Sequence, residues 1–153
     1  MLPVPSTESK RCLVTGAAGF MGSHVSQILV ERGHQVAAVD DLSGGFRENV
    51  PENCRFYSVS INQPLEDLFQ EFRPELVYHL AAYAAEGLSH HIPIFNYTNN
   101  LLGTANVLSA AYRNGVRHFV YTSSIAVYGH PQTPEPFDES TAPCPCDPYG
   151  ISK

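Results

Sequence analysis

A glycine-rich turn between a predicted strand and a predicted helix constrains this chain most. The turn runs Gly16-Ala17-Ala18-Gly19-Phe20-Met21-Gly22 and follows the apolar segment Cys12-Leu13-Val14-Thr15, which we expect to form a buried strand. Apolar residues then recur at helical spacing from Ser23 to Arg32, and Gly33 supplies a stop. A strand, a glycine turn and a helix in this order direct backbone N–H groups at one point, which predicts a diphosphate site.

The spacing of the glycines is G-x-x-G-x-x-G, with one residue more in the first gap than the common dinucleotide fingerprint, and a tight structural turn would also explain it. The next apolar segment, Gln35–Val39, favours the dinucleotide because it ends at Asp40, about 20 residues beyond the turn, where an adenosine ribose would lie. Asp40 can accept hydrogen bonds from both ribose hydroxyls. Together with Asp41 it would repel a 2′-phosphate. The nearest arginine that could pair with such a phosphate, Arg47, lies further along the chain. NAD is therefore favoured over NADP.

The length and composition fit one ordinary globular domain. The chain has 153 residues, of which 43% are hydrophobic and 16% charged. We expect a loose leader over residues 1–10 and one domain over 11–153. The net charge of −6 argues against a nucleic-acid partner, and no apolar run is long enough to predict a membrane span. Cys144-Pro145-Cys146 lacks a second ligand pair, so no metal is predicted, and the four cysteines favour the cytoplasm over a disulfide scaffold.

Strands and helices are predicted to alternate along the rest of the chain. The expected elements are strands at Arg55–Ser60, Leu76–Ala81 and Arg117–Thr122, and helices at Pro64–Phe72 and Ile94–Arg113. This alternation predicts a doubly wound parallel α/β sheet of the Rossmann type, with strand order 3-2-1-4-5 and a cleft at the carboxyl ends of the strands. A proline-rich irregular loop over His130–Pro148 follows. A short helix is expected to begin at Asp147-Pro148.

The last predicted helix carries a candidate general base. Tyr149 and Lys153 stand four residues apart, which would place them on one face of that helix. A nearby ammonium favours phenolate over phenol, so Tyr149 could accept a proton from a substrate hydroxyl. Ser123 and Ser124, at the end of the fifth predicted strand, could hydrogen-bond the same oxygen. A solvated helix face and simple capping of the strand end are the alternative interpretations.

Six motifs in the same order make the chain resemble a known family, the extended short-chain dehydrogenase/reductases, and within it the NAD-dependent sugar epimerase/dehydratase group typified by UDP-glucose 4-epimerase. The motifs cover nearly the whole chain. They are Thr15-Gly16-Ala17-Ala18-Gly19-Phe20-Met21-Gly22, Asp40-Asp41-Leu42-Ser43, His79-Leu80-Ala81-Ala82, Asn99-Asn100-Leu101-Leu102-Gly103-Thr104, Thr122-Ser123-Ser124-Ile125-Ala126-Val127-Tyr128-Gly129 and Tyr149 through Lys153.

The resemblance implies a role for each motif. Tyr149 would take the proton from a sugar hydroxyl, Lys153 would bind the nicotinamide ribose, and Ser124 would be the catalytic serine. Phe20 and Met21 would cover the diphosphate, and Asn99 would lie on the nicotinamide side. The residues expected to contact NAD are Gly16, Gly19, Phe20, Met21, Gly22, Asp40, Asp41, Leu42, Ser43, Gly44, Ser60, Ile61, Leu80, Ala81, Ala82, Asn99, Thr122, Tyr149 and Lys153.

Three departures from the family pattern shape the expected function. Ser60-Ile61 replaces an acidic residue that often meets the adenine amine, and Ile125-Ala126 replaces the acidic residues typical of dehydratases, which favours epimerisation or reduction. Family members are roughly twice as long. We therefore expect the amino-terminal half of a nucleotide-sugar epimerase, with the carboxyl-terminal strands and the substrate domain missing. A UDP-sugar is the expected substrate. The resemblance also implies a homodimer of the full-length form, through the predicted helix Ile94–Arg113 and the helix that begins at Pro148. An NAD-dependent dehydrogenase or reductase of another sugar or alcohol, and a non-catalytic NAD-binding fragment, are the alternatives.

Overall fold

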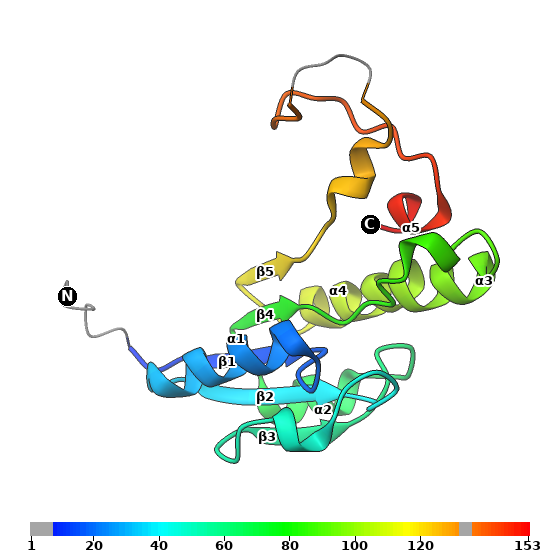
Figure 1. Cartoon of the computed structure of the whole chain (residues 1–153). Coiled ribbons are helices and arrows are strands. Elements are labelled where there is room, and N and C mark those ends of the chain that lie inside the picture. The colour runs from blue at the N-terminus through cyan, green and yellow to red at the C-terminus, as the bar shows by residue number, and fades with distance from the viewer. Residues whose placement is uncertain (1–7, 132–135) are drawn as a thin grey trace.

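The computed structural model describes residues 8–131 and 136–153. Most of the expected leader and part of the proline-rich loop, including Pro134, lie outside the described residues, so the division into a leader and a domain stays a prediction. The described chain contains a five-stranded sheet in the order β3-β2-β1-β4-β5, with every neighbouring pair parallel. The strands are β1 (Arg11–Thr15), β2 (Gln35–Asp40), β3 (Arg55–Ser58), β4 (Leu76–His79) and β5 (His118–Tyr121). The predicted fold class and strand order are confirmed (Figure 1).

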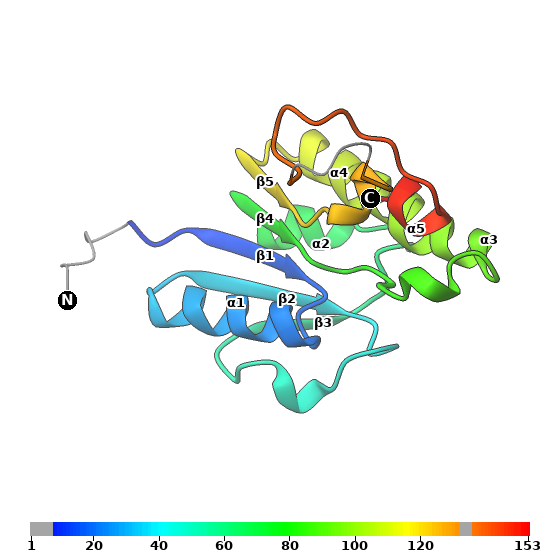
Figure 2. The same cartoon turned by 45° about the horizontal axis from the view of Figure 1, so that its top comes forward.

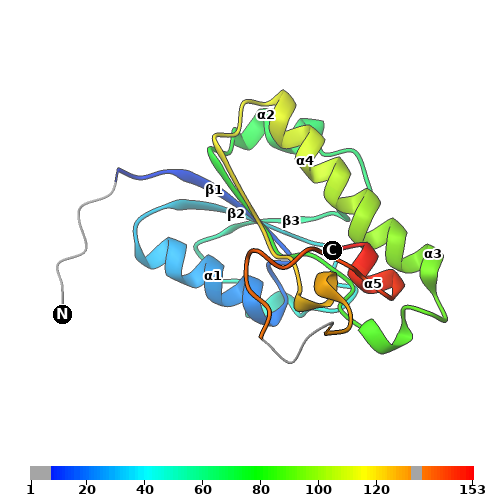
Figure 3. The same ribbon diagram turned by 90° about the horizontal axis from the view of Figure 1, so that it is seen from above.

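Helices cover both faces of this sheet. The main ones are α1 (Phe20–Glu31), α2 (Glu66–Phe72) and α4 (Gly103–Arg113). Figure 3 shows α1 on one side of the strands and α2 with α4 on the other. The shorter elements are η1 (Arg47–Asn49), η2 (Glu86–Leu88), α3 (Pro93–Asn96), the π-helical turn η3 (Tyr97–Leu102), η4 (Ile125–Tyr128) and α5 (Pro148–Ile151).

The two core layers follow from the alternation of side chains along the strands. On β1, Leu13 points into the cluster that contains Phe69 of α2 and Val107 of α4. Its neighbours Cys12 and Val14 point to the opposite face, into the cluster with Leu29 of α1. All of these side chains are buried. The sequence of a central strand that is buried on both faces is a continuous run of apolar residues, as it is over residues 12–14.

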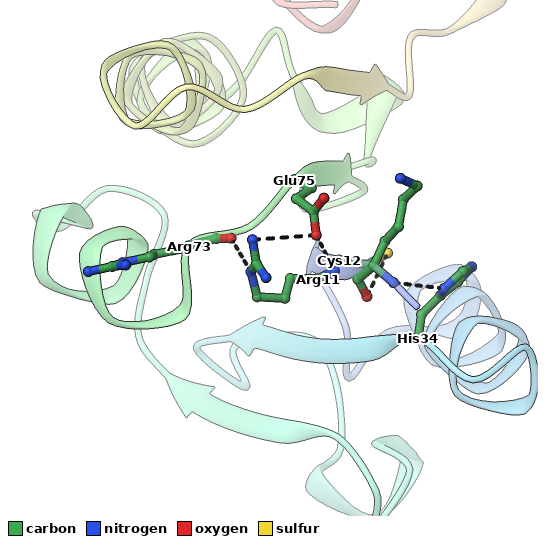
Figure 4. Close-up of polar contacts among 6 residues, drawn as sticks. Arg11, Cys12, His34, Arg73 and Glu75 are labelled. Atoms are coloured by element: carbon green, nitrogen blue, oxygen red, sulfur yellow. Dashed lines mark hydrogen bonds and ion pairs between the residues drawn. The ribbon is translucent and has the colours of Figure 1, made fainter. Parts of the chain in front are cut away.

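A cluster of polar side chains lies at the amino-terminal ends of the strands β1 and β4 (Figure 4). The Glu75 carboxylate accepts the backbone N–H of Arg11 at 3.1 Å and lies 3.4 Å from its guanidinium. The guanidinium also donates to the carbonyl of Arg73 at 2.7 Å. The hydrogen bond from the Arg11 backbone, followed by nearby positive charge, lowers the pKa of Glu75. This cluster ties β1 to β4 at the end opposite the predicted cleft.

Several predicted boundaries were wrong by a few residues. Helix α1 begins at Phe20 rather than Ser23, because Gly19 adopts an extended N-cap conformation and its carbonyl already accepts the Ser23 N–H. Strands β3, β4 and β5 are each shorter than predicted, and α2 begins two residues after Pro64. The predicted helix over 94–113 is helical from Pro93 onward but contains η3, a π-helical turn that a 3.6-residue period does not reveal.

Helix α5 begins at Pro148 as predicted. The Asp147 carboxylate is its N-cap and accepts the Gly150 N–H at 2.8 Å. Figure 2 shows α5 near α3 and α4, and α5 contacts α3 and η3. The helix ends at Ile151, so Lys153 lies two residues beyond it. Ser152, which follows Ile151, still has a right-handed helical conformation, and that Tyr149 and Lys153 share one face stays a prediction.

Candidate cofactor cleft and catalytic side chains

The glycine turn packs directly against the end of β4. Gly16 has a φ of +69°, and a Cβ on it would lie 2.7 Å from the Ala81 nitrogen. A Cβ on Gly22 would lie 2.0 Å from the Gly16 carbonyl oxygen, so this glycine is required by the close packing of α1 on the turn. No side chain caps the amino end of α1. Its first-turn N–H groups are therefore donors for an anion.

Two acidic residues shape the loop after β2. The Asp40 carboxylate accepts the Ala18 N–H at 3.0 Å and the Leu42 N–H at 2.8 Å, which joins this loop to the glycine turn. Leu42 has a φ of +61°, a left-handed conformation that is uncommon for its residue type. Partial burial acts to raise the pKa of Asp41, but hydrogen bonds from Ser43 and Ser60 outweigh it and lower the pKa. Asp41 is therefore ionised across the neutral range.

One cavity of about 270 Å³ lies at the carboxyl ends of the strands, where the sheet topology predicts a cleft. Its lining includes the predicted residues Gly16, Gly19, Asp40, Asp41, Ser43, Gly44, Ile61, Leu80, Ala81, Ala82 and Asn99. The other predicted contacts lie outside this lining, namely Phe20, Met21, Gly22, Leu42, Ser60, Thr122, Tyr149 and Lys153. Phe20 and Met21 are exposed in the first turn of α1. The structure thus gathers the glycine turn, the Asp40 loop and the loop after β4 around one space.

Five lining residues were not predicted: Val39, Gly45, Val59, Tyr83 and Phe95. The turn-rich sequence Ser43-Gly44-Gly45 was a signal that could have identified Gly45. A Cβ on Gly45 would lie 2.6 Å from the Ala18 carbonyl carbon, so the close contact requires glycine. Tyr83 and Phe95 had none. Their rings meet edge to face with centroids 5.0 Å apart, across a contact that only the tertiary structure brings together.

The three predicted catalytic residues come from two segments that do not line the cavity. The Ser124 hydroxyl oxygen accepts the Ala126 N–H at 3.2 Å and caps η4, so its hydrogen is available to a second acceptor. Tyr149 is 9% exposed. The Lys153 ammonium lies 4.9 Å from the centre of the Tyr121 ring, and burial lowers the pKa of this lysine. The Ser123 hydroxyl donates to the Lys153 carbonyl at 3.1 Å.

His79 is a buried polar residue to which the sequence reasoning assigned no role of its own. Its Nδ1 lies 2.7 Å from the Thr15 hydroxyl, and its Nε2 lies 2.9 Å from the Thr104 hydroxyl. The Thr15 hydroxyl oxygen also lies 3.2 Å from the N–H groups of both Leu80 and Ala81. Burial, followed by the charge of Lys153, lowers the pKa of His79 to about 4. The ring therefore serves as a neutral link beneath the cleft.

Among residues 8–131 and 136–153, no group of three or more histidine, cysteine, aspartate or glutamate side chains is placed to hold a metal ion. In the same part of the chain, no helix combines the length and apolar character that crossing a membrane requires.

Comparison with known families decides the class of the chain. A sequence model described as the NAD dependent epimerase/dehydratase family matches residues 12–153. The chain belongs to this family. Among curated family relatives, a UDP-glucose 4-epimerase of Streptomyces lividans is 41% identical over 150 residues, and that of Drosophila melanogaster is 36% identical over 157 residues. These alignments cover 95% and 92% of this chain, and 45% of each relative.

Solved structures of the family share the fold. A UDP-glucose 4-epimerase of Thermus thermophilus in complex with NAD matches with a TM-score of 0.89 and 42% identity. One of Thermotoga maritima, solved with UDP-glucose, matches with a TM-score of 0.90 and 40% identity. Each match covers 94% of this chain and 47% of the other. The chain thus spans somewhat less than half the length of these family relatives.

Proposed function

We propose that the chain binds NAD in the cleft at the carboxyl-terminal ends of its strands. The observation that carries this proposal is the lining of the cavity described above. It joins a glycine turn at a helix amino end, an acidic loop after β2 and small apolar residues after β4. These are the three environments that a diphosphate, a ribose and a nicotinamide ring require. The NAD-bound Thermus relative supports the same assignment.

The residues present fit such a cofactor. Gly16 and Gly19 leave the backbone open, and the uncapped amino end of α1 offers donors to a diphosphate. Asp40 would accept hydrogen bonds from the adenosine ribose, while Leu80, Ala81 and Asn99 would line the nicotinamide side. When bound, NAD supplies a reversible hydride acceptor, which an epimerisation needs because one stereocentre is lost and rebuilt.

The charges around the ribose loop support NAD rather than NADP. Asp40 and Asp41 both line the cavity. The nearby cation is engaged elsewhere, since the Arg47 guanidinium lies 4.6 Å from the centre of the Phe56 ring and donates to the Val50 carbonyl at 3.4 Å. A 2′-phosphate would therefore meet two carboxylates and no matching arginine.

For catalysis we assign one task to each of three side chains. Tyr149 takes the proton from a hydroxyl of the sugar. Ser124 donates a hydrogen bond to the same oxygen, because its own oxygen is already used as an acceptor for Ala126. Lys153 holds the nicotinamide ribose, the role that the family resemblance implies. The reaction we propose is epimerisation of a nucleotide sugar, in which the hydride leaves one face of the sugar and returns to the other.

The substrate and the assembly are part of the same proposal. The relatives named above are UDP-glucose 4-epimerases, which makes a UDP-sugar the proposed substrate. A homodimer is proposed through the helical segment 94–113, where Ile94, Leu101 and Leu102 are exposed apolar residues. The buried free cysteines Cys12 and Cys54 are consistent with a cytoplasmic location.

Calorimetric titration with NAD and NADP tests the cofactor assignment. We expect NAD to bind and NADP to bind roughly tenfold more weakly, because repulsion by two carboxylates is of the order of 1.4 kcal/mol. Asp40→Asn should weaken NAD binding by about tenfold and narrow the difference between the two cofactors. Asp67→Asn, on the exposed side of α2, is the matched control and should change neither affinity. The proposal fails if NAD does not bind, or if Asp40→Asn binds it as well as the unmodified chain.

A further inference from the structure

Two exposed cysteines lie close together in a segment to which the proposed function gives no task. Cys144 and Cys146 are both exposed, whereas the other two cysteines of the chain, Cys12 and Cys54, are buried. Cysteine is among the residue types most often buried, so an exposed pair is the more informative observation. Neither exposed cysteine lines the cavity at the carboxyl-terminal ends of the strands. The pair therefore belongs neither to the core nor to the proposed cofactor cleft.

The backbone of this pair is held against the turn that follows η4. The Cys144 N–H donates to the Val127 carbonyl oxygen at 3.0 Å. Gly129 has a φ of +68°, and a Cβ on it would collide with the Cys144 carbonyl oxygen and lie 3.6 Å from the Cys146 nitrogen. Only glycine allows the two segments to approach so closely. Both cysteines are thus attached to backbone that rests on one turn.

The residue between the two cysteines packs against α5. The Cβ of Pro145 lies 3.2 Å from the point that a Cβ on Gly150 would occupy, and Gly150 is buried in α5. The proline ring also fixes φ at its own position and disfavours the helical conformation for Cys144. Figure 1 shows this segment leading directly into α5. The tripeptide therefore presents two exposed thiols from a backbone of restricted freedom.

Two thiols in this arrangement form a pair of ligands for one ion. Residues two apart have Cα atoms no more than about 7 Å apart, so an ion between the two sulfurs can contact both. Thiolate sulfur is a soft ligand that favours Cu(I) and zinc over magnesium and calcium. A structural zinc site takes four ligands, and among residues 8–131 and 136–153 no group of three or more candidate metal ligands comes together. A soft ion that needs only two sulfurs is therefore the ion that fits.

We propose that Cys144 and Cys146 form a two-coordinate thiolate site for a soft monovalent cation, Cu(I). Binding replaces the two S–H bonds by two S–Cu bonds and releases the two protons, and neither sulfur nor copper changes its oxidation state. Affinity for the ion therefore rises with pH. The site goes beyond the proposed function and is independent of it, because neither thiol lines the cavity.

Anaerobic titration of the whole chain with Cu(I), in competition with a chromophoric chelator of known affinity, tests the site. The thiols are reduced beforehand, and the reductant is removed under nitrogen. We expect one Cu(I) per chain. Cys144→Ala and Cys146→Ala should each weaken binding by at least about a hundredfold, because two ligands on one chain gain this much from their effective concentration. Cys144→Ser and Cys146→Ser should behave in the same way, since a hydroxyl is a hard ligand, and they decide the matter if an alanine variant does not fold.

Cys54→Ala is the matched control, because it removes a thiol and leaves the exposed pair intact. It should still bind one Cu(I) with unchanged affinity, and X-ray absorption of the loaded chain should show two sulfur ligands. The proposal is overturned if the unmodified chain binds no Cu(I), or if a variant that lacks either exposed thiol binds it as tightly as the unmodified chain. Binding of one Zn(II) per two chains, more tightly than Cu(I), would also overturn it, since that result indicates a four-cysteine site between two copies.

Discussion

At the scale of single residues, His79 shows how a buried polar side chain can be held in one protonation state. The Thr15 hydroxyl oxygen accepts two backbone N–H groups, so we assign its single hydrogen to His79 Nδ1. The ring proton must then sit on Nε2 and point to Thr104. This chain of hydrogen bonds connects the strand before the glycine turn to α4, and a second ring proton would break it at Thr15.

We therefore expect His79 to destabilise the fold in acid. Its pKa falls from the ordinary 6.5 to about 4 in the folded chain. The unfolded chain takes up the proton first. The contribution of neutral His79 to the free energy of unfolding is therefore fully present above pH 6.5 and is lost as pH falls through about 4. A shift of this size corresponds to roughly 3 kcal/mol. Histidine NMR titration checks it, with denaturant unfolding measured over the same pH range. A His79 ring that titrates near 6.5 would contradict the assignment.

At the scale of elements, the glycine turn and α1 act as one unit. Gly22 lies in the first turn of α1, where helix propensity alone would favour alanine. The close approach of the helix to the Gly16 carbonyl excludes alanine at this position, because no side chain fits between the two backbones. At α5, Asp147 caps the start of the helix, and Asn100 donates a hydrogen bond to the Ser152 hydroxyl just after Ile151.

Gly22→Ala tests the packing of α1 on the turn. We expect a loss of about 3 kcal/mol in the free energy of unfolding, since the added Cβ meets backbone rather than a movable side chain. NAD affinity should fall as well, because the turn must shift. Gly87→Ala is the matched control, as a Cβ there meets nothing within 4 Å. Equal unfolding midpoints for the two variants in urea would show that the turn tolerates a side chain.

At the scale of the whole molecule, the proposed cofactor cleft offers no cationic side chain to a nucleotide sugar. The net charge is −6, and no lysine or arginine is among the described residues that line the cavity. Strand β5 pairs with β4 alone, and Val120 on it is 46% exposed. A UDP-sugar carries two negative charges on its diphosphate, which cations stabilise in protein sites.

We therefore predict that the 153-residue chain, given NAD and UDP-galactose, forms little or no UDP-glucose. Chromatography of the nucleotide sugars measures the product, and absorbance of NADH reports any net oxidation, which would favour a dehydrogenase instead. Steady interconversion would contradict this prediction. In that case the variant Tyr149→Phe tests whether the activity arises at the proposed site. If it does, the activity must vanish while NAD affinity barely changes.

The sequence by itself determined the strand order, the position of the glycine turn and the placement of Asp40 at the cleft. Each depends on local patterns, namely apolar alternation, turn residues and the spacing from one strand end to the next. Element ends were less predictable. The start of α1 depended on the backbone of Gly19.

Only the tertiary structure decided the π-helical turn and the partners of His79 and Asn100. The reason is physical. Hydrogen bonds such as that from Asn100 to Ser152 join residues distant in the chain, and no periodicity or propensity encodes which buried polar groups will meet once the two core layers have packed.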